Sequence, residues 1–301
     1  MNKFTAGKGL LSLAALALVV TGCSSSDSGS GSEPSGSALP SIAVDEALAA
    51  KVPAAIKSSG KLTIGTDASY APSEFFAEDG STIVGFDVDL GKAIASKLGL
   101  AGNFENSSFD SLIVGVQNGK FDSAMSSFTI NPERLKQVNM VSYFDAGTAW
   151  ATAKANPQGV VADDACGKTV AVQKATVQAD DIEVKNKACK DAGKPEINVQ
   201  IYGLQSDATT AVVNGKADAM LADSPVIAYA IKQSGKLEQL GDIYDSAPYG
   251  VAIPKDQMEL ADAVAGAVDA LIADGSYQAI LDQWGVSNGA ITKSEVNPAV
   301  S

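Results

Sequence analysis

Arg134 is the only arginine among the 22 basic residues of this 301-residue chain, and all the others are lysines. Its planar guanidinium can bind both oxygens of a carboxylate at once, which an ammonium group cannot do. We therefore expect Arg134 to bind an anionic group of a ligand. The alternative is a surface ion pair with the neighbouring Glu133 or another nearby acid.

Other kinds of chemistry are excluded by composition. The chain has no histidine, which rules out Ser-His-Asp and Cys-His catalysis and His-ligated zinc, and its three cysteines are too few for a Cys₄ site. Its net charge of -13 disfavours nucleic acid as a partner, because the phosphate backbone needs a positive surface. We expect no metal, no cofactor and no nucleic acid.

Strand and helix patterns alternate along the chain, which is typical of an α/β fold with parallel sheets. Strands are predicted at residues 61–66, 121–128, 168–173, 197–202 and 218–221. Helices are predicted at residues 84–99, 109–118, 177–192, 207–214, 256–271 and 276–284.

Two segments, 116–122 and 212–218, resemble each other. In both, a predicted helix ends in Asn-Gly and a predicted strand begins at an aspartate. Ser127 and Asp223 each lie five residues after that aspartate, at the carboxyl end of the strand, where open α/β sheets bind ligands. Two similar lobes that face each other would bring Ser127 and Asp223 together across a cleft.

The N-terminus reads as a secretory signal at residues 1–22, with lysines before an apolar run too short to span a bilayer. The run ends at Cys23, in a pattern that resembles the lipobox of bacterial lipoproteins and predicts lipidation of this cysteine. A Ser- and Gly-rich stretch at 24–40 predicts a flexible linker, part of a tether and lead-in at 23–57. The alternative is a secreted protein without an anchor.

Two further cysteines, Cys166 and Cys189, remain after lipidation. Because an exported protein meets an oxidising environment, the simplest expectation is one disulfide between them. The alternative is two buried free thiols.

Four segments in this order resemble family 3 of the bacterial extracellular solute-binding proteins, the polar amino-acid receptors of ABC importers. They are residues 65–72 (the family's first binding loop), 85–95 (its signature), 126–134 (its carboxylate-binding segment) and 273–277 followed by Trp284. The likeness runs from about Lys61 to Gly285. It implies a type II periplasmic binding protein-like α/β fold of two Rossmann-like lobes with a hinge: lobe I at 58–146 plus 248–301, and lobe II at 147–247.

The resemblance also implies how a ligand is bound. Arg134 would share the ligand carboxylate with the helix start at Thr176, Val177 and Gln178, and the alternative for Thr176 is simple capping. Asp223 would accept the ligand ammonium, and its alternative is to cap the helix that follows it.

Further site residues are implied in the first lobe. Ser127 and Thr129 would form hydrogen bonds to the ligand. Tyr70 and Phe109 would sandwich its aliphatic part, although Phe109 could equally be a core residue. Asp67 would face the ligand side chain and favour a cation or an amide donor there, unless it is only a turn residue.

The sequence departs from the family at Ala175, where relatives usually have glycine. Asp67 suits lysine, arginine, ornithine or histidine, and also the amide of glutamine, whereas glutamate and aspartate rank lower. The resemblance implies a monomeric, non-enzymatic receptor that binds a polar amino acid and delivers it to an ABC permease. It would be lipid-anchored at the extracytoplasmic face of the bacterial cell membrane.

Two alternatives remain. One is an enzyme on the same fold, similar to the cyclohexadienyl dehydratases, which would need an acid or base in the cleft, and Glu74 is the additional candidate near it. The other is a partner of a ligand-dependent sensor.

Overall fold

The computed structural model describes residues 42–300. The predicted signal peptide, the predicted lipidation site Cys23 and the linker at 24–40 lie outside the described residues. Between residues 42 and 300, every helix is too short or too polar to cross a bilayer.

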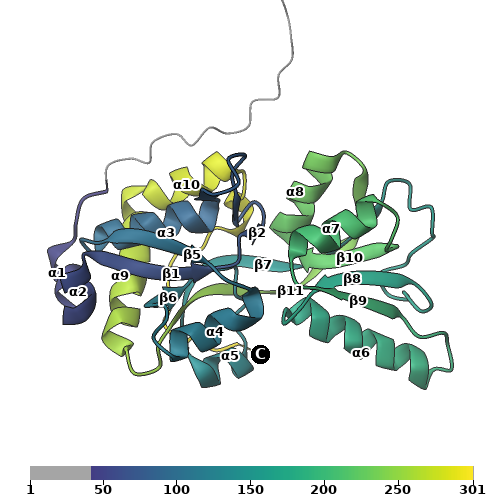
Figure 1. The fold of residues 1–301 in the computed structure, drawn as a ribbon, viewed down its shortest axis with the longest axis horizontal. Coiled ribbons are helices and arrows are strands. Elements are labelled where there is room, and N and C mark those ends of the chain that lie inside the picture. Colours follow the sequence, from purple (N-terminus) through teal and green to yellow (C-terminus); the bar gives the residue numbers. More distant parts are fainter. Residues whose placement is uncertain (1–41, 301) are drawn as a thin grey trace, which may run out of the picture. The chain divides into compact units, whose positions relative to one another are not determined.

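The described chain folds around one eight-stranded sheet with the strand order β5-β1-β6-β11-β7-β10-β8-β9 (Figure 1). Its strands are β1 (Lys61–Thr66), β5 (Ala101–Asn106), β6 (Ser123–Ala124), β7 (Asn139–Ala153), β8 (Thr169–Gln173), β9 (Asn198–Tyr202), β10 (Ala219–Asp223) and β11 (Leu237–Ile253). A second, three-stranded sheet consists of β2 (Ser69–Tyr70), β3 (Glu74–Phe76) and β4 (Ile83–Val84).

The large sheet is parallel toward both edges and antiparallel in the middle. β1 pairs in parallel with β5 and β6, and β8 pairs in parallel with β9 and β10. We call β5, β1 and β6 the first half of the sheet, and β10, β8 and β9 the second half. The expected parallel pairing is confirmed within each half.

The two central strands were not predicted as strands. β7 and β11 contain 15 and 17 residues and pair with each other in antiparallel fashion, with register shifts along β11. β11 also pairs with β6 of the first half, and β7 with β10 of the second half. The lobe boundaries implied at 146–147 and 247–248 fall within these two strands.

Helices pack on both faces of the sheet, as the α/β prediction requires (Figure 1). Those with the first half are α1 (Glu46–Ala50), α2 (Ala54–Ser59), α3 (Phe86–Lys97), α4 (Phe109–Gln117), α5 (Pro132–Gln137), α9 (Met258–Asp274), α10 (Ser276–Trp284) and the 3₁₀-helix η1 (Ser287–Gly289). Those with the second half are α6 (Val177–Asp191), α7 (Gln205–Val213) and α8 (Ser224–Ser234).

The predicted helices form because each has one apolar face. In α3, Leu90 and Ile94 are buried against the sheet together with Leu98, and the helix is followed by Gly99 at a φ of 73°, a left-handed conformation that glycine adopts without steric cost. α5 has no predicted counterpart, because it has only six residues and begins at an Asn-Pro turn signal. α8 is the helix that is expected from the sequence after Asp223, where no bounds are predicted.

The lead-in to the body is helical. Asp45 caps α1 by accepting hydrogen bonds from the N–H groups of Ala47 at 3.0 Å and Leu48 at 3.1 Å. Leu48 packs against the core of the first half, and the N–H of Asp45 donates to the carbonyl of Lys97 at the end of α3. Residues 42–57 are therefore folded against the body.

The predicted disulfide between Cys166 and Cys189 is confirmed, and the free-thiol alternative is wrong. It joins the segment before β8 to the last turns of α6, with the two Cα atoms 5.6 Å apart. The disulfide thereby links α6 covalently to the segment before β8, within the second half.

The strand predicted at 121–128 is too long, because the observed β6 covers only Ser123–Ala124. Ser127 has a φ of 50°, in the left-handed region, which is incompatible with an extended strand. Beyond it, the chain is held by β11 through hydrogen bonds from the N–H of Gly250 to the carbonyl of Phe128 and from the N–H of Ile130 to the carbonyl of Pro248, both 2.8 Å.

Candidate functional site

A cavity lies between the two halves of the described body. All nine residues that the sequence proposes as ligand-binding line it: Asp67, Tyr70, Phe109, Ser127, Thr129, Arg134, Thr176, Gln178 and Asp223. Val177, the middle residue of the predicted helix start, lines it as well.

These residues lie close together because several of them stand at or just after the carboxyl ends of strands. Asp67 follows β1, Ser127 lies shortly after β6, and Asp223 is the last residue of β10. The carboxyl ends of parallel strands meet at one edge of a sheet, where loops and helix starts carry ligand-binding groups. The juxtaposition of Ser127 and Asp223 that the repeated segments predict is confirmed.

Arg134 is buried, with only 8% of its surface exposed. Its Nη1 donates to the carbonyl of Thr129 at 2.8 Å and its Nη2 to the carbonyl of Ala175 at 3.2 Å. The guanidinium also lies 5.5 Å from the ring centroid of Phe109 and 5.3 Å from that of Phe128.

The surface ion pair considered for Arg134 is not formed, because Glu133 pairs with Lys136 at 2.6 Å and both are exposed. Burial lowers the pKa of Arg134 to about 10, with the charge of Asp223 acting in the opposite direction. The guanidinium therefore remains charged at neutral pH. It is a buried cation whose observed acceptors are neutral carbonyls, which is a favourable setting for an anion.

Asp223 is the second buried charge, 5% exposed. Its Oδ2 accepts from the hydroxyl of Tyr70 and its Oδ1 from Nε2 of Gln178, both at 2.8 Å. Although it occupies the N-cap position of α8, its side chain makes no capping hydrogen bond. Asp223 lines the cavity, and burial raises its pKa.

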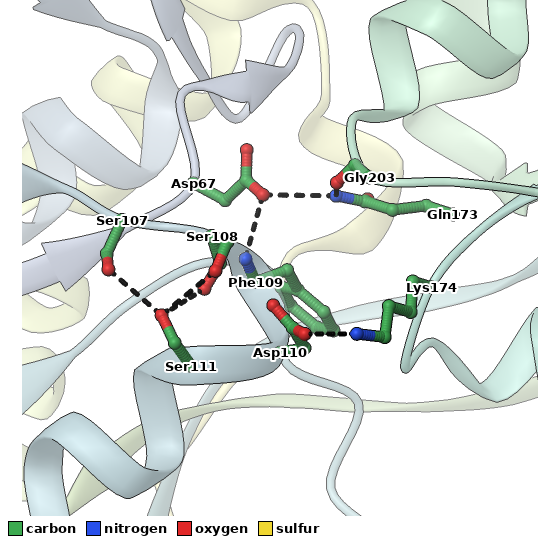
Figure 2. A network of polar contacts seen from close by, with 9 residues as sticks. All are labelled: Asp67, Ser107, Ser108, Phe109, Asp110, Ser111, Gln173, Lys174 and Gly203. Carbon is green, nitrogen blue, oxygen red and sulfur yellow. Dashed lines mark hydrogen bonds and ion pairs between the residues drawn. The ribbon is translucent and has the colours of Figure 1, made fainter.

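Asp67 provides a third buried charge, 2% exposed. Its Oδ2 accepts from the N–H of Phe109 at 2.9 Å and from Nε2 of Gln173 at 3.1 Å (Figure 2). Figure 2 shows its second oxygen pointing away from both donors. Burial raises the pKa of Asp67, and interactions with Ser69, Phe109 and Gln173 oppose the rise, that with Ser69 most strongly. Asp67 is therefore not only a turn residue, because its carboxylate is buried and hydrogen-bonded beside the cavity.

The start of α6 offers backbone donors to the same cavity. Thr176 caps this helix, since its Oγ1 accepts from the N–H of Ala179 at 3.1 Å. Val177 and Gln178 are the first two residues of α6, and N–H groups at such positions have no acceptor within the helix. The capping role of Thr176 and a donor role for the helix start are thus compatible.

Ala175 adopts a φ of 63°, a left-handed conformation that costs an alanine more than a glycine. This turn directs the carbonyl of Ala175 to Arg134. The departure from glycine that the resemblance identifies is therefore accommodated with local backbone strain.

Two cavity residues, Ser126 and Gln173, are not among the predicted ones. Gln173 ends β8 at the same sheet edge as Asp223, so its position along the strand was an available signal. Ser126 precedes Ser127 directly. The contact between Gln173 and Asp67, 106 residues apart, could not be read from the sequence.

Contacts across the cavity join the two halves. They include the hydrogen bonds Tyr70–Asp223, Asp67–Gln173 and Arg134–Ala175 and the ion pair Asp110–Lys174 at 2.7 Å. Figure 2 shows the Asp67 and Asp110 contacts on either side of Phe109. Asp110 and Lys174 are partly exposed, so their ion pair contributes little to stability.

The sequence profile of the bacterial extracellular solute-binding proteins, family 3, matches residues 62–287. The arginine-binding protein ArgT of Corynebacterium glutamicum is 37% identical over 252 residues, covering 83% of this chain and 82% of its own length. A solved ancestral arginine-binding protein bound to arginine superposes with a TM-score of 0.69 at 35% identity, covering 75% of this chain and 98% of that chain. The ancestral amino acid-binding protein AncCDT-1, a precursor of cyclohexadienyl dehydratase, gives a TM-score of 0.67 at 34% identity and covers 76% of this chain and 97% of that chain. The chain belongs to family 3 of the bacterial extracellular solute-binding proteins.

Proposed function

We propose that this protein is the receptor of an ABC importer for a cationic amino acid, with arginine as the first candidate. The observation that carries the proposal is the charge pattern of the cavity, which is lined by one guanidinium, Arg134, and two carboxylates, Asp67 and Asp223. Arginine carries one carboxylate and two cations. Each charge of the ligand would thus meet an opposite one, which matters because a buried charge without a partner is costly.

Each group has an assigned role in this proposal. The ligand carboxylate binds Arg134 and the N–H groups at the start of α6, and the ligand ammonium binds Asp223. The side-chain cation binds the oxygen of Asp67 that faces away from Phe109 and Gln173. Glutamine fits the same frame through its amide, but it leaves Asp67 without a cationic partner.

Aromatic rings complete the proposed site. Tyr70 is 6% exposed, and its hydroxyl is fixed between the N–H and the carboxylate of Asp223. The ring of Phe109 stacks on Phe128 with centroids 4.8 Å apart. Tyr70 and Phe109 would enclose the methylene groups of the ligand.

We propose further that β7 and β11 form the hinge between lobe I (58–146 plus 248–301) and lobe II (147–247). The proposal is supported by their position, since β11 pairs with β6 of the first half, β7 pairs with β10 of the second half, and the two strands pair with each other. Ligand binding would then favour a closed form held by contacts such as Tyr70–Asp223.

The proposal also covers how the protein acts in transport. The relatives named as arginine-binding proteins support delivery of the ligand to a membrane permease. A signal peptide at 1–22 and lipidation at Cys23 would hold the protein, as a monomer, at the extracytoplasmic face of the membrane. Cys23→Ala should release it from the membrane fraction without changing ligand affinity.

The non-enzymatic role is also a proposal. The similarity to a precursor of cyclohexadienyl dehydratase favours an enzyme as the second candidate. Glu74, the additional acid considered for that role, is fully buried and does not line the cavity. A turnover assay with prephenate and arogenate would detect such an enzyme.

Calorimetric titration of the purified protein with the twenty amino acids tests the proposal. We expect arginine to bind best, other cationic amino acids and glutamine to bind less tightly, and glutamate not to bind. Absence of binding by every amino acid would refute it, and prephenate turnover would then support the second candidate.

A further inference from the structure

Two acids, Glu74 and Asp87, lie behind the cavity without lining it, and both are fully buried. Glu74 begins β3 and Asp87 lies in the first turn of α3. They meet because Gly85, at a φ of 139°, allows the chain to pass close to Ser73, where a side chain would clash with the carbonyl. The N–H of Asp87 donates to that carbonyl at 3.0 Å.

Hydrogen-bond donors are distributed unequally over the two carboxyl groups. Oδ2 of Asp87 accepts from the hydroxyl of Tyr143 at 2.7 Å and from the N–H of Ser127 at 2.9 Å. Oε1 of Glu74 accepts from the hydroxyl of Ser126 at 2.8 Å. Asp87 is therefore the better placed of the two to carry the negative charge.

The other oxygen of each acid, Oε2 of Glu74 and Oδ1 of Asp87, is buried and receives no N–H or hydroxyl donor from residues 42–300. The two carboxyl groups are close enough for the charge of Asp87 to raise the pKa of Glu74. Two ionised carboxylates would repel each other and have no hydrogen to share, so pairing them requires a proton on one of them. A single proton between Oε2 and Oδ1 satisfies both atoms.

Electrostatics place that proton on Glu74. Burial, the charge of Asp87 and the charge of Asp67 raise the pKa of Glu74 well above its ordinary value. Burial also raises the pKa of Asp87, to about 6, but the hydrogen bonds from Tyr143, Ser127 and Glu74 oppose that rise. Two tyrosines also face the pair, Tyr143 on β7 and Tyr70 on β2. Burial first and neighbouring acids second raise the pKa of both well above its ordinary value, so Tyr143 remains a neutral donor.

We propose that Glu74 and Asp87 share one proton and that this singly charged pair positions the ligand-facing serines of the cavity. Asp87 holds the N–H of Ser127, whose φ of 50° is a strained conformation that needs such a fixed partner. Glu74 holds the hydroxyl of Ser126, which in turn accepts from the N–H of Asp67 at 3.1 Å. The positioning role rests on the proposed function, whereas the shared proton does not.

The pair has a predictable effect on stability. The folded protein keeps a proton on Glu74 at pH values where the unfolded chain loses it. The stabilisation that comes from this proton is therefore complete below the ordinary pKa of glutamate, 4.5, and declines as pH rises toward the raised pKa of the folded state. Glu74→Gln keeps a donor to Asp87 but cannot lose a proton, so it abolishes this decline.

The first experiment needs no ligand. Free energies of unfolding are measured between pH 5 and pH 8 (about one unit apart) for wild type, Glu74→Gln and the control Glu78→Gln, an exposed glutamate that follows β3. Relative to wild type, Glu74→Gln should gain about tenfold in the folding equilibrium constant per pH unit. Glu78→Gln should run parallel to wild type.

Infrared spectroscopy identifies the proton directly. Wild type at neutral pH should show the carbonyl band of a protonated carboxylic acid, and Glu74→Gln should lack it. A wild-type spectrum without that band, or a Glu74→Gln stability profile parallel to that of wild type, would overturn the shared proton.

Arginine titration at neutral pH tests the positioning role. Glu74→Met, similar in length but without a donor, leaves Oδ1 of Asp87 unsatisfied and should weaken binding by about tenfold or more, and Glu74→Gln should restore most of the loss. Equal affinities for wild type, Glu74→Met and Glu74→Gln would overturn positioning. If wild type binds no arginine, the proposed function fails while the first experiment still decides on the proton. If Glu74→Met does not fold, the affinity of Glu74→Gln decides, since a loss of tenfold would contradict its retained donor.

Discussion

The segments 116–122 and 212–218 enter the two halves of the sheet in the same way. Each ends a helix at an asparagine and turns at a glycine in the left-handed conformation, with φ values of 71° at Gly119 and 69° at Gly215. Both glycines are needed because this conformation is costly for other residues.

The agreement extends to the aspartate that closes each segment. Oδ2 of Asp122 accepts from the N–H of Thr63, and Oδ2 of Asp218 accepts from the N–H of Thr169, in both cases at 2.8 Å. Each aspartate thereby fixes the start of the neighbouring parallel strand. The sequence similarity of the segments reflects the same local structure twice.

The two halves differ at the far end of the strand. In the second half, β10 continues regularly to Asp223, which places a carboxylate in the cavity. In the first half, β6 ends after two residues, and the left-handed Ser127, whose N–H donates to Asp87, lines the cavity with a neutral side chain. Equivalent positions in the two halves therefore carry different side chains, a neutral serine and a charged aspartate. The charged cavity residues of the first half are Asp67 and Arg134.

The largest effect on binding is expected for Arg134→Lys. Arg134 contacts carbonyls of both halves, and lysine would lose the second parallel hydrogen bond to the ligand carboxylate. Affinity for arginine should fall by about 2–4 kcal/mol, or roughly thirty- to a thousandfold. The matched control Lys136→Gln, on the exposed face of α5, should leave calorimetric affinity unchanged. A loss below about threefold for Arg134→Lys would remove this residue from the site.

A disulfide distinguishes the second half from the first. Replacing Cys166 and Cys189 together by serine should lower the free energy of unfolding by about 3 kcal/mol, because it frees a loop that spans 23 positions. Denaturant unfolding measures this effect. Arginine affinity should not change, since neither cysteine lines the cavity. An affinity loss with full stability would contradict the assignment of the disulfide to folding alone.

The structural equivalence of segments 116–122 and 212–218 can be tested with Asp122→Ala and Asp218→Ala. Each substitution leaves a strand N–H without its acceptor and should destabilise by about 1–3 kcal/mol. Because the two environments match, the two losses should agree closely. The corresponding asparagine variants keep an acceptor oxygen and should lose less. Losses that differ severalfold would show that the repeated segments are not energetically equivalent.

The sequence predicts the parts of the fold that local chemistry determines. β1, α6 and α10 lie within one residue of their predicted bounds, because their apolar patterns and turn residues mark both ends. β7 and β11 escape prediction because each pairs with strands distant in sequence and neither has a simple alternation. Ser127 shortens β6 through a conformation that Asp87 stabilises from 40 positions away.

For the site, the residues themselves indicate Arg134, Ser127 and Asp223, the resemblance supplies the other six predicted residues, and all nine line the cavity. The sequence does not predict which residues these nine contact. Gln173 and Asp67 meet only because the two halves of the sheet face each other, and Glu74 meets Asp87 only because Gly85 allows a close approach. Such contacts depend on tertiary packing, which local sequence patterns do not encode.

The smallest effect is expected at Ala175, in the loop after β8. Ala175→Gly should relieve its left-handed strain and raise the free energy of unfolding by about 0.5–1 kcal/mol, since the added flexibility of the unfolded chain offsets part of the gain. Its carbonyl would still accept from Arg134, so affinity should be retained. Destabilisation in denaturant unfolding would contradict the strain.

The central claim, that two carboxylates in the cavity select a ligand with two cations, is tested by comparing arginine with citrulline, whose uncharged urea group has nearly the same shape as the guanidinium. Wild type should prefer arginine by about tenfold to a hundredfold, the range of a charge-assisted hydrogen bond, and Asp67→Asn should reduce that preference to about threefold or less. The amide oxygen of the Asp67→Asn variant would still accept from the N–H of Phe109, so folding should be preserved. An equal preference for arginine in both proteins, or none in wild type, would contradict the role of Asp67 and with it the proposed cationic ligand.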